Sequence, residues 1–79
     1  MNILIKYCGM WGYKDKALGV GKEINEVYPN MEIDYMRANK GQFDIIYETR
    51  HYILFSKDEK HRFPEKGEIV GLIGRNENG

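Results

Sequence analysis

The 79-residue chain has very little cysteine and no net charge. Its one cysteine, Cys8, excludes an internal disulfide framework. Its twelve basic and twelve acidic side chains cancel, so the chain has no overall basic field to hold a nucleic-acid backbone. We therefore expect neither a disulfide-stapled domain nor a nucleic-acid-binding protein.

Long apolar segments are also absent from the sequence. No run approaches the roughly 20 residues that a membrane span needs. The chain starts with a short strand-like segment, residues 1–5, without the charged start and cleavage site of a signal peptide. These features predict a cytoplasmic protein, kept in a compartment where thiols stay reduced, with no membrane partner.

The periodicity of the chain is that of one small α/β domain covering residues 1–79. Residues 2–7 read as a strand, and because Ile3 and Leu4 place apolar groups on opposite faces, we expect a central strand. The period then becomes helical over residues 14–28, and Pro29 ends that helix.

The second half of the chain reads mainly as β-structure. Alternation over residues 31–35 and 42–47 predicts two strands, and the β-favouring run at residues 52–55 predicts another. Residues 48–51 connect the last two strands as a hairpin. A charged loop is expected over residues 57–62.

Pro64 predicts the first turn of a final helix, and residues 75–79 are expected to form a frayed tail. The apolar face of that helix consists of Ile69, Leu72 and Ile73. The order β-α-β-β-β-α then predicts a four-stranded mixed sheet with two helices on one face. A right-handed crossover between the first two strands places Cys8 at the carboxyl end of a strand, where α/β proteins commonly carry their sites.

The segment Tyr7-Cys8-Gly9-Met10-Trp11-Gly12-Tyr13-Lys14 contains half of a redox motif. In a Cys-x-x-Cys motif, a tight strand-to-helix turn brings residues i and i+3 within disulfide range, a Cα separation of about 4.4–6.8 Å. The N–H groups of that turn favour the thiolate. Here position i is Cys8 and position i+3 is Trp11. The first cysteine and the surrounding residues of the motif are therefore present, but the second redox residue is missing.

The chain resembles the selenoprotein W-like (Rdx) family, whose first motif reads Cys-x-x-selenocysteine or Cys-x-x-Cys, followed by Gly-Tyr. The matching residues share one register over nearly the whole chain: Tyr7 to Lys14, Lys16-Ala17-Leu18, Lys22-Glu23-Ile24, Tyr28-Pro29, Glu32-Ile33-Asp34, Gly41-Gln42-Phe43-Asp44-Ile45, Leu54-Phe55-Ser56-Lys57 and Phe63-Pro64. Trp11 is the main departure, and Gly19, Gly21 and Lys40 also differ from the family pattern.

The resemblance implies a thioredoxin-like fold and a small thiol or selenol redox protein. Residue 11 would be the nucleophile and Cys8 the group that resolves its mixed adducts. Glutathione or a protein thiol would be the exchange partner, with glutathione as co-substrate and no other cofactor. With Trp11 in place, the chain would keep at most a monothiol function, in which Cys8 is capped by glutathione and released by another thiol.

Trp11 has two explanations. The selenocysteine codon UGA differs from the tryptophan codon UGG in one base, so a misread or recoded selenocysteine codon gives this residue. Alternatively, the tryptophan is genomic, in a member of the family that has lost the pair. We favour the first explanation because Gly9, Gly12 and Tyr13 all fit the intact motif.

The other candidate residues each have a structural alternative. Cys8 leaves a strand beside glycines and ahead of Lys14, which predicts an exposed thiolate, whereas a lone cysteine is by default a buried thiol. Gly9 and Gly12 let the loop around Met10 bend or let a partner approach, and plain loop flexibility predicts the same residues. Tyr13 would flank the thiol or serve as an apolar anchor for the helix, and by resemblance Phe43 lies near the motif loop. Core packing explains both residues equally well.

A binding role is the rival to redox chemistry. In that alternative Trp11, Tyr7 and Tyr13 form an exposed aromatic anchor for a protein partner. Codon 11 distinguishes the two: UGA favours redox chemistry and UGG favours binding. His51 and His61 stand ten residues apart without further ligands at metal spacing, so no metal site is expected. We expect a monomer or a weak dimer.

Overall fold

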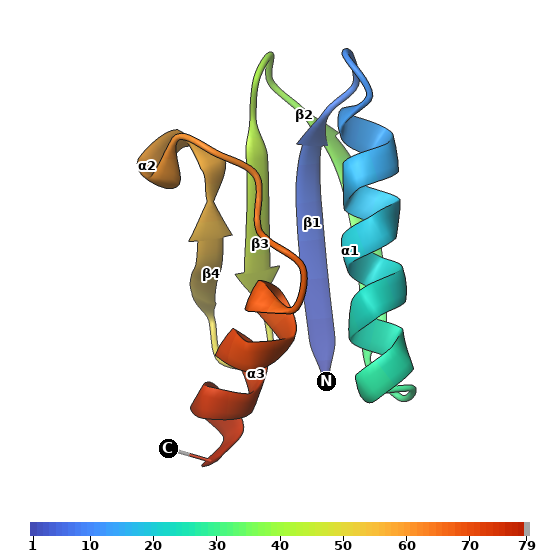
Figure 1. Ribbon diagram of the computed structural model, residues 1–79, viewed down its shortest axis with the longest axis vertical. Coiled ribbons are helices and arrows are strands. Elements are labelled where there is room, and N and C mark those ends of the chain that lie inside the picture. The colour runs from blue at the N-terminus through green and yellow to red at the C-terminus, as the bar shows by residue number, and fades with distance from the viewer. Residues whose placement is uncertain (79) are drawn as a thin grey trace.

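The computed structural model describes residues 1–78 and shows an α/β domain (Figure 1). Its elements are β1 (Asn2–Cys8), α1 (Tyr13–Val27), β2 (Glu32–Ala38), β3 (Phe43–Tyr47), β4 (Tyr52–Ser56), α2 (Lys57–Lys60) and α3 (Glu68–Asn78). The four strands and the two long helices occur in the order that the sequence predicts. None of the helices over the described residues is long and apolar enough to cross a membrane.

The four strands form one mixed sheet in the order β2-β1-β3-β4. β1 pairs parallel with β2 and antiparallel with β3, and β3 pairs antiparallel with β4. β1 is therefore a central strand, as its apolar residues on both faces predict. An irregularity at Ile45 and Ile46 shifts the register between β3 and β4.

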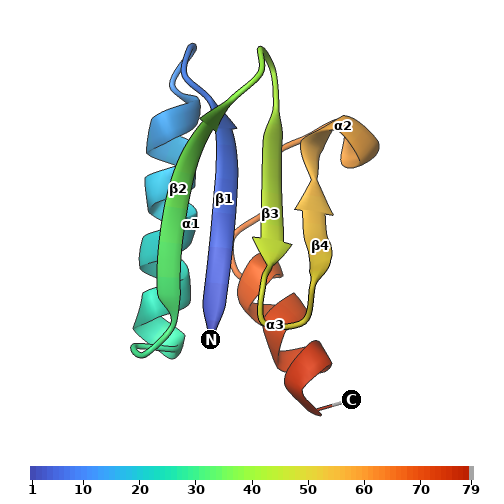
Figure 2. The same cartoon turned by 180° about the vertical axis from the view of Figure 1, so that it is seen from behind.

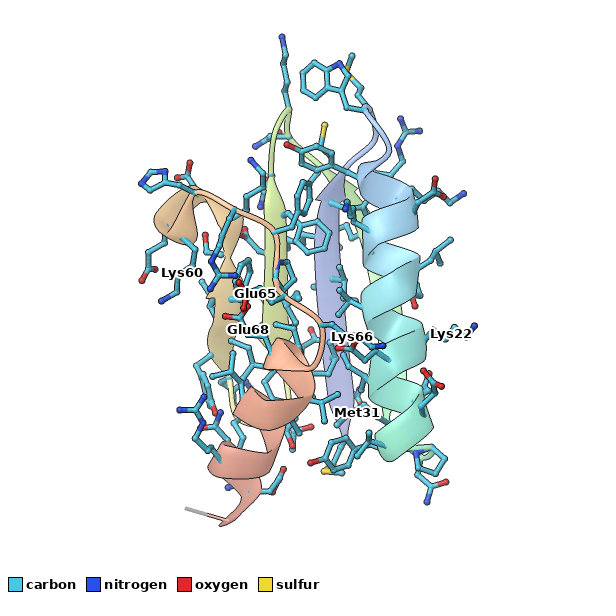
Figure 3. All side chains as sticks on the ribbon, viewed as in Figure 1. Lys22, Met31, Lys60, Glu65, Lys66 and Glu68 are labelled. Carbon is cyan, nitrogen blue, oxygen red and sulfur yellow. The ribbon has the colours of Figure 1, made fainter. Side chains whose placement is uncertain are left out.

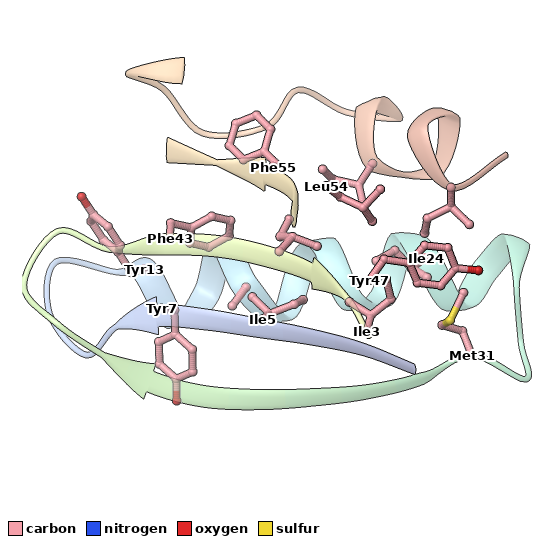
Figure 4. Packing of buried hydrophobic residues seen from close by; sticks show 14 of the residues in the cluster. Ile3, Ile5, Tyr7, Tyr13, Ile24, Met31, Phe43, Tyr47, Leu54 and Phe55 are labelled. Atoms are coloured by element: carbon pink, nitrogen blue, oxygen red, sulfur yellow. The ribbon is translucent and has the colours of Figure 1, made fainter. Parts of the chain in front are cut away.

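Helices α1 and α3 lie on the same face of the sheet, and Figure 2 shows the opposite face with no helix over the described residues. The core lies between these two layers (Figure 4). It consists mainly of fully buried side chains of the sheet and the two helices: Ile3, Ile5, Phe43, Ile45, Tyr47, Ile24, Ile69 and Ile73. The predicted two-layer arrangement is confirmed.

The α2–α3 region differs from the sequence prediction in two ways. The expected charged loop contains one helical turn, α2, which His61 ends by donating its backbone N–H to the Lys57 carbonyl at 2.6 Å. The last helix begins at Glu68, four residues after Pro64. Gly67 has a φ of +81°, which lies outside the helical region and delays the start of α3.

The C-terminal end of α3 is helical through Asn78, so the prediction of a frayed tail from residue 75 is wrong; Gly79 lies outside the described residues. The reason is a tertiary anchor. The Tyr47 hydroxyl donates to the Glu77 carboxylate, and Arg50 pairs with Glu77 at 3.0 Å. Burial, followed by the Glu77 hydrogen bond, raises the pKa of Tyr47 to about 12.

The first helix packs closely on the sheet through Gly21. A Cβ at this position would collide with the Tyr35 hydroxyl of β2, which explains a glycine in a helix interior. Glu23, which reads from the sequence as part of a solvated face, instead accepts a hydrogen bond from the Gly67 N–H at 2.8 Å. α1 therefore fixes both β2 and the entry to α3.

Candidate functional site

The motif loop, residues 9–12, leaves the carboxyl end of β1 and leads into α1. Cys8 ends the strand, and its backbone N–H donates to the Gln42 carbonyl at 2.7 Å. That bond places the start of β3 and its first residue, Phe43, beside the motif. Figure 1 shows the loop, the β2–β3 connection and α2 at one end of the molecule, with the N-terminus and the C-terminal end of α3 at the other.

Cys8 is buried, with 1% of its surface exposed. The prediction of an exposed thiolate is wrong. The side chain belongs to the same buried cluster as Tyr13 and Phe43, and a thiol is weakly polar enough to lie there as a small apolar group. The structural alternative for this lone cysteine therefore describes the folded state.

Trp11 has the opposite environment, with 63% of its surface exposed. The Tyr13 N–H donates to the Met10 carbonyl at 3.2 Å, which closes a four-residue turn. Its two central residues, Trp11 and Gly12, have φ angles of +56° and +76°, as in a type I′ turn. The turn presents the side chain of position 11 to solvent while position 8 stays buried.

The two motif glycines have different surroundings. Gly12 adopts a left-handed conformation as the residue before α1, and nothing lies within 4 Å of where its Cβ would be, so its role is conformational. At Gly9 the guanidinium of Arg37 lies where a Cβ would be, and because the Arg37 side chain is exposed it can move aside for a larger residue. The left-handed backbone is therefore the reason for Gly12, whereas plain loop flexibility still accounts for Gly9.

The rings of Tyr13, Phe43 and Phe63 form an aromatic cluster next to the motif loop. The Tyr13 ring meets Phe63 edge to face with centroids 4.8 Å apart, and Phe63 meets Phe43 at 5.2 Å. Figure 4 shows Tyr13 and Phe43 next to each other at the loop end of the core. Both residues pack in the core and also lie next to the motif, so core packing and a place beside the motif are compatible for Tyr13 and Phe43.

Lysine side chains lie over these aromatic rings at cation–π distances. Lys57 Nζ is 5.7 Å from the Tyr13 centroid, and Lys40 Nζ is 5.3 Å from that of Trp11. Lys16 Nζ is 5.3 Å from the centroid of Phe63. Lys14, predicted as a flanking group, is exposed in the first turn of α1.

Sequence reasoning did not assign Arg37, Lys40, Lys57 or Phe63 to the site. Phe63 and Lys57 matched the family pattern, but they reach the motif only because the segment after β4 folds back over the sheet. Arg37 stands beside Gly9 because β2 pairs in parallel with β1 and ends level with it. Parallel pairing of two predicted strands was the signal that could have placed Arg37 there.

The exposed aromatic anchor of the binding alternative is smaller than predicted. Tyr7 and Tyr13 are buried in the core. Met10 and Trp11 are the two large apolar side chains that the motif loop exposes. A partner of this loop would contact those two residues.

A shallow groove of about 280 Å³ lies between α1 and the segment before α3. Its apolar floor includes Val20, Phe63 and Pro64. No residue of the motif from Cys8 to Gly12 is among its described lining residues. Thiol chemistry at positions 8 and 11 would therefore take place on the loop rather than in this groove.

The chain is similar to known proteins in both sequence and structure. The model of the Rdx family matches residues 2–75. "Migration and invasion enhancer 1" from Bos taurus and its Mus musculus counterpart are each 30% identical over 79 residues, which cover 100% of this chain and 67% of theirs. A crystal structure of a Bordetella parapertussis protein superimposes with a TM-score of 0.85 at 19% identity, covering 95% of each chain. That structural likeness supports the predicted thioredoxin-like α/β fold.

Proposed function

The chain belongs to the Rdx family, and on that basis we propose that its site is built for thiol or selenol exchange through positions 8 and 11. The observation that carries the proposal is the contrast in exposure between the end of β1 and the turn that follows it. Position 11 is 63% exposed and position 8 is 1% exposed. An exposed group can attack a partner, and a buried group next to it can resolve the adduct without meeting the partner first.

The proposed reaction needs a thiolate or selenolate at position 11. That group attacks one sulfur of a disulfide, forms a mixed bond and releases the other sulfur as a thiolate. The Cys8 thiolate then attacks residue 11 and displaces the second thiolate, leaving an internal bond between positions 8 and 11. The partner gains two electrons, and two external thiols, such as glutathione, return the protein to its reduced form in a cytoplasmic setting.

With Trp11 in place the first step of this reaction does not occur, because indole is not a nucleophile for disulfides. The remaining thiol is that of Cys8, which is buried. We therefore propose that the chain with Trp11 is inactive in exchange and does not act as a monothiol protein while folded. Its intact counterpart would have selenocysteine or cysteine at position 11.

A second candidate function is a binding module based on the motif loop. It is favoured by the exposure of Trp11 and Met10, since exposed tryptophan is enriched at interface hot spots. The codon for residue 11 separates the two functions. UGA with a selenocysteine-insertion element in the transcript supports exchange chemistry, and UGG supports binding.

The exchange proposal is tested by Trp11→Cys, with Trp11→Ser as the matched control of similar size and no thiol. Incubated with glutathione disulfide, the Cys variant should release glutathione thiol, and the Ser variant and the unchanged chain should release essentially none. In a Trp11→Cys/Cys8→Ser variant the reaction should stop at a stable glutathione adduct on residue 11, visible by mass spectrometry.

Burial of Cys8 supplies the internal control for this experiment. In the unchanged chain Cys8 should react with a thiol reagent at least about tenfold more slowly when folded than after unfolding. A Trp11→Cys variant that reduces glutathione disulfide no faster than Trp11→Ser would refute the exchange proposal. Binding through the motif loop would then be the better account.

A further inference from the structure

The charges of this neutral chain are separated along its long axis. We define the motif half as residues 6–19, 36–44 and 55–62, and the far half as the other described residues. These ranges follow the sheet register, in which Lys6 stands between Met36 and Asp44, and Asp44 pairs with Ser56. The motif half is the upper part of Figure 1, with the motif loop, the β2–β3 connection and α2.

The motif half carries a formal charge of +4. Its eight basic side chains are Lys6, Lys14, Lys16, Arg37, Lys40, Lys57, Lys60 and Arg62, and its four acidic ones are Asp15, Asp44, Asp58 and Glu59. The far half has the reverse balance, −4. Its basic side chains are Lys22, Arg50, Lys66 and Arg75, and its acidic ones are Glu23, Glu26, Glu32, Asp34, Glu48, Glu65, Glu68 and Glu77.

Apart from Arg62 and Glu68, which pair across the boundary at 2.7 Å and offset each other, the charges of the two halves form separate electrostatic surfaces. The molecule is 34 Å long, whereas the Debye length at physiological salt is about 8 Å. A partner at the motif loop therefore meets the positive half with the negative half largely screened. The net charge of the whole chain is zero, which argues against a nucleic-acid partner. It does not reveal the local excess of positive charge in the motif half.

Three cations of the motif half stand beside the motif loop or beside Tyr13, the residue that follows it. The Arg37 guanidinium lies against Gly9, Lys40 lies over the Trp11 ring, and Lys57 lies over the Tyr13 ring. They come from β2, from the β2–β3 connection and from the start of α2. The ion pairs among the described side chains are Arg50–Glu77 and Arg62–Glu68. Neither pair includes one of these three cations.

We propose that the motif half docks an acidic segment of a partner protein, with the exposed loop residues Met10 and Trp11 as the apolar centre of the contact. A peptide segment fits because it can touch the positive half and an exposed aromatic side chain together. An extended polyanion such as nucleic acid would also run along the negative half. The inference rests on the proposed function only in that such a segment would deliver its disulfide to position 11.

A second copy of the chain is a less suitable occupant. Its negative half is complementary to the motif half, but this head-to-tail contact joins different surfaces of the two copies. Such contacts continue into open chains unless the rotation happens to close a ring. A separate acidic partner satisfies the same charges in a finite complex.

The test uses two peptides of equal length, one rich in glutamate and one rich in lysine, each with a central serine so that no thiol chemistry takes place. Titrated into ¹⁵N-labelled protein, the glutamate peptide should shift the amide signals of residues 9–12, Arg37 and Lys40. Its affinity should fall steeply with added salt, as expected for contacts between exposed charges. The lysine peptide should not shift those signals.

Charge-reversal variants locate the site. Arg37→Glu/Lys40→Glu should weaken binding of the glutamate peptide about tenfold or more. The matched control Lys22→Glu/Arg75→Glu makes the same change in net charge on exposed far-half residues and should leave the affinity within about twofold. Figure 3 shows Lys22 pointing away from the body of the protein. Lys40→Glu alone, in a connection between strands, serves if the double variant does not fold.

Three results would overturn the proposal. The first is equal binding of the two peptides, and the second is an equal loss of affinity in the motif-half and far-half variants. The third is self-association: a sedimentation mass of the unchanged chain that rises with concentration, and a lower mass in both charge-reversal variants. The last result would identify a second copy as the occupant. Since the peptides contain no thiol, failure of docking and failure of exchange at position 11 are separate outcomes.

Discussion

At the scale of single residues, position 11 combines exposure with an unfavourable backbone conformation. Trp11 holds a φ of +56°, a region that costs an L-residue about 1–2 kcal/mol relative to the right-handed form. The other non-glycine residues with positive φ have ordinary structural roles, His51 in the β3–β4 hairpin and His61 at the end of α2. Only at position 11 does the strain coincide with a proposed chemical site.

Replacing Trp11 with glycine should stabilise the protein. Glycine adopts the left-handed conformation without steric cost, so we expect the free energy of unfolding to rise by about 0.5–1 kcal/mol, measured by chemical denaturation. Met10→Gly is the control, because Met10 is not among the positive-φ residues and glycine there should destabilise the protein or have little effect. A Trp11→Gly variant less stable than the unchanged chain would mean that the ring contacts of Trp11 outweigh the backbone cost.

Residue identity predicted the motif but not the environment of its members. Cys8, Gly9, Gly12 and Tyr13 were recognisable because their spacing is local. Cys8 is buried in a cluster that includes Phe43, which lies 35 positions further along the chain. A local pattern contains no information on such a contact.

At the scale of elements, the connection between α2 and α3 holds the aromatic cluster in place. Arg62 donates two hydrogen bonds to the Glu68 carboxylate, at 2.7 and 2.9 Å, across the segment that contains Phe63. The Glu65 N–H donates to the same carboxylate at 2.9 Å. The Arg62 hydrogen bond, followed by that of Glu65, lowers the pKa of Glu68 from 4.5 to about 2.

This carboxylate makes stability depend on pH. Because the pKa of Glu68 is lower in the folded state, its contribution is present above about pH 4.5 and is lost as pH falls toward 2. Arg62 is partly exposed, so we expect Glu68→Gln to cost at most about 1 kcal/mol at neutral pH and close to nothing at pH 2. The measurement is the free energy of unfolding at both values of pH.

Glu26→Gln provides the control for this pH effect, since Glu26 is exposed on α1 and its side chain makes no hydrogen bond or ion pair with the part of the chain that the structure describes. It should change stability little at either pH. A Glu68→Gln variant whose deficit is the same at neutral and acid pH would show that the effect is one of packing rather than of charge.

Hydrophobic periodicity predicted the four strands, the two long helices and the central place of β1. Periodicity could not predict where α3 begins and ends, because both limits depend on distant partners. Glu23 of α1 holds the entry at Gly67, and Tyr47 of β3 anchors Glu77 near the C-terminal end. Helix limits set by such contacts have no local sequence signal.

At the scale of the whole molecule, the site lies at one end of the Rdx-family domain. That end combines a buried sulfur at position 8, an exposed residue at position 11 and an excess of positive charge. The separation of charge was not visible in the composition, because it arises only when β2 ends level with β1 and α2 folds to the same end. The central claim is that positions 8 and 11 form one reactive pair.

The most direct measurement is the mass of the Trp11→Cys variant after mild oxidation. The account predicts a monomer that has lost two hydrogens, with one internal bridge between residues 8 and 11, since only two residues separate these positions and a small movement of the loop can bring them to disulfide geometry. The Trp11→Cys/Cys8→Ser variant should show no such loss in its monomer. Oxidation of Trp11→Cys that gives only intermolecular dimers or two free thiols would show that the turn holds the two positions apart and would contradict the claim.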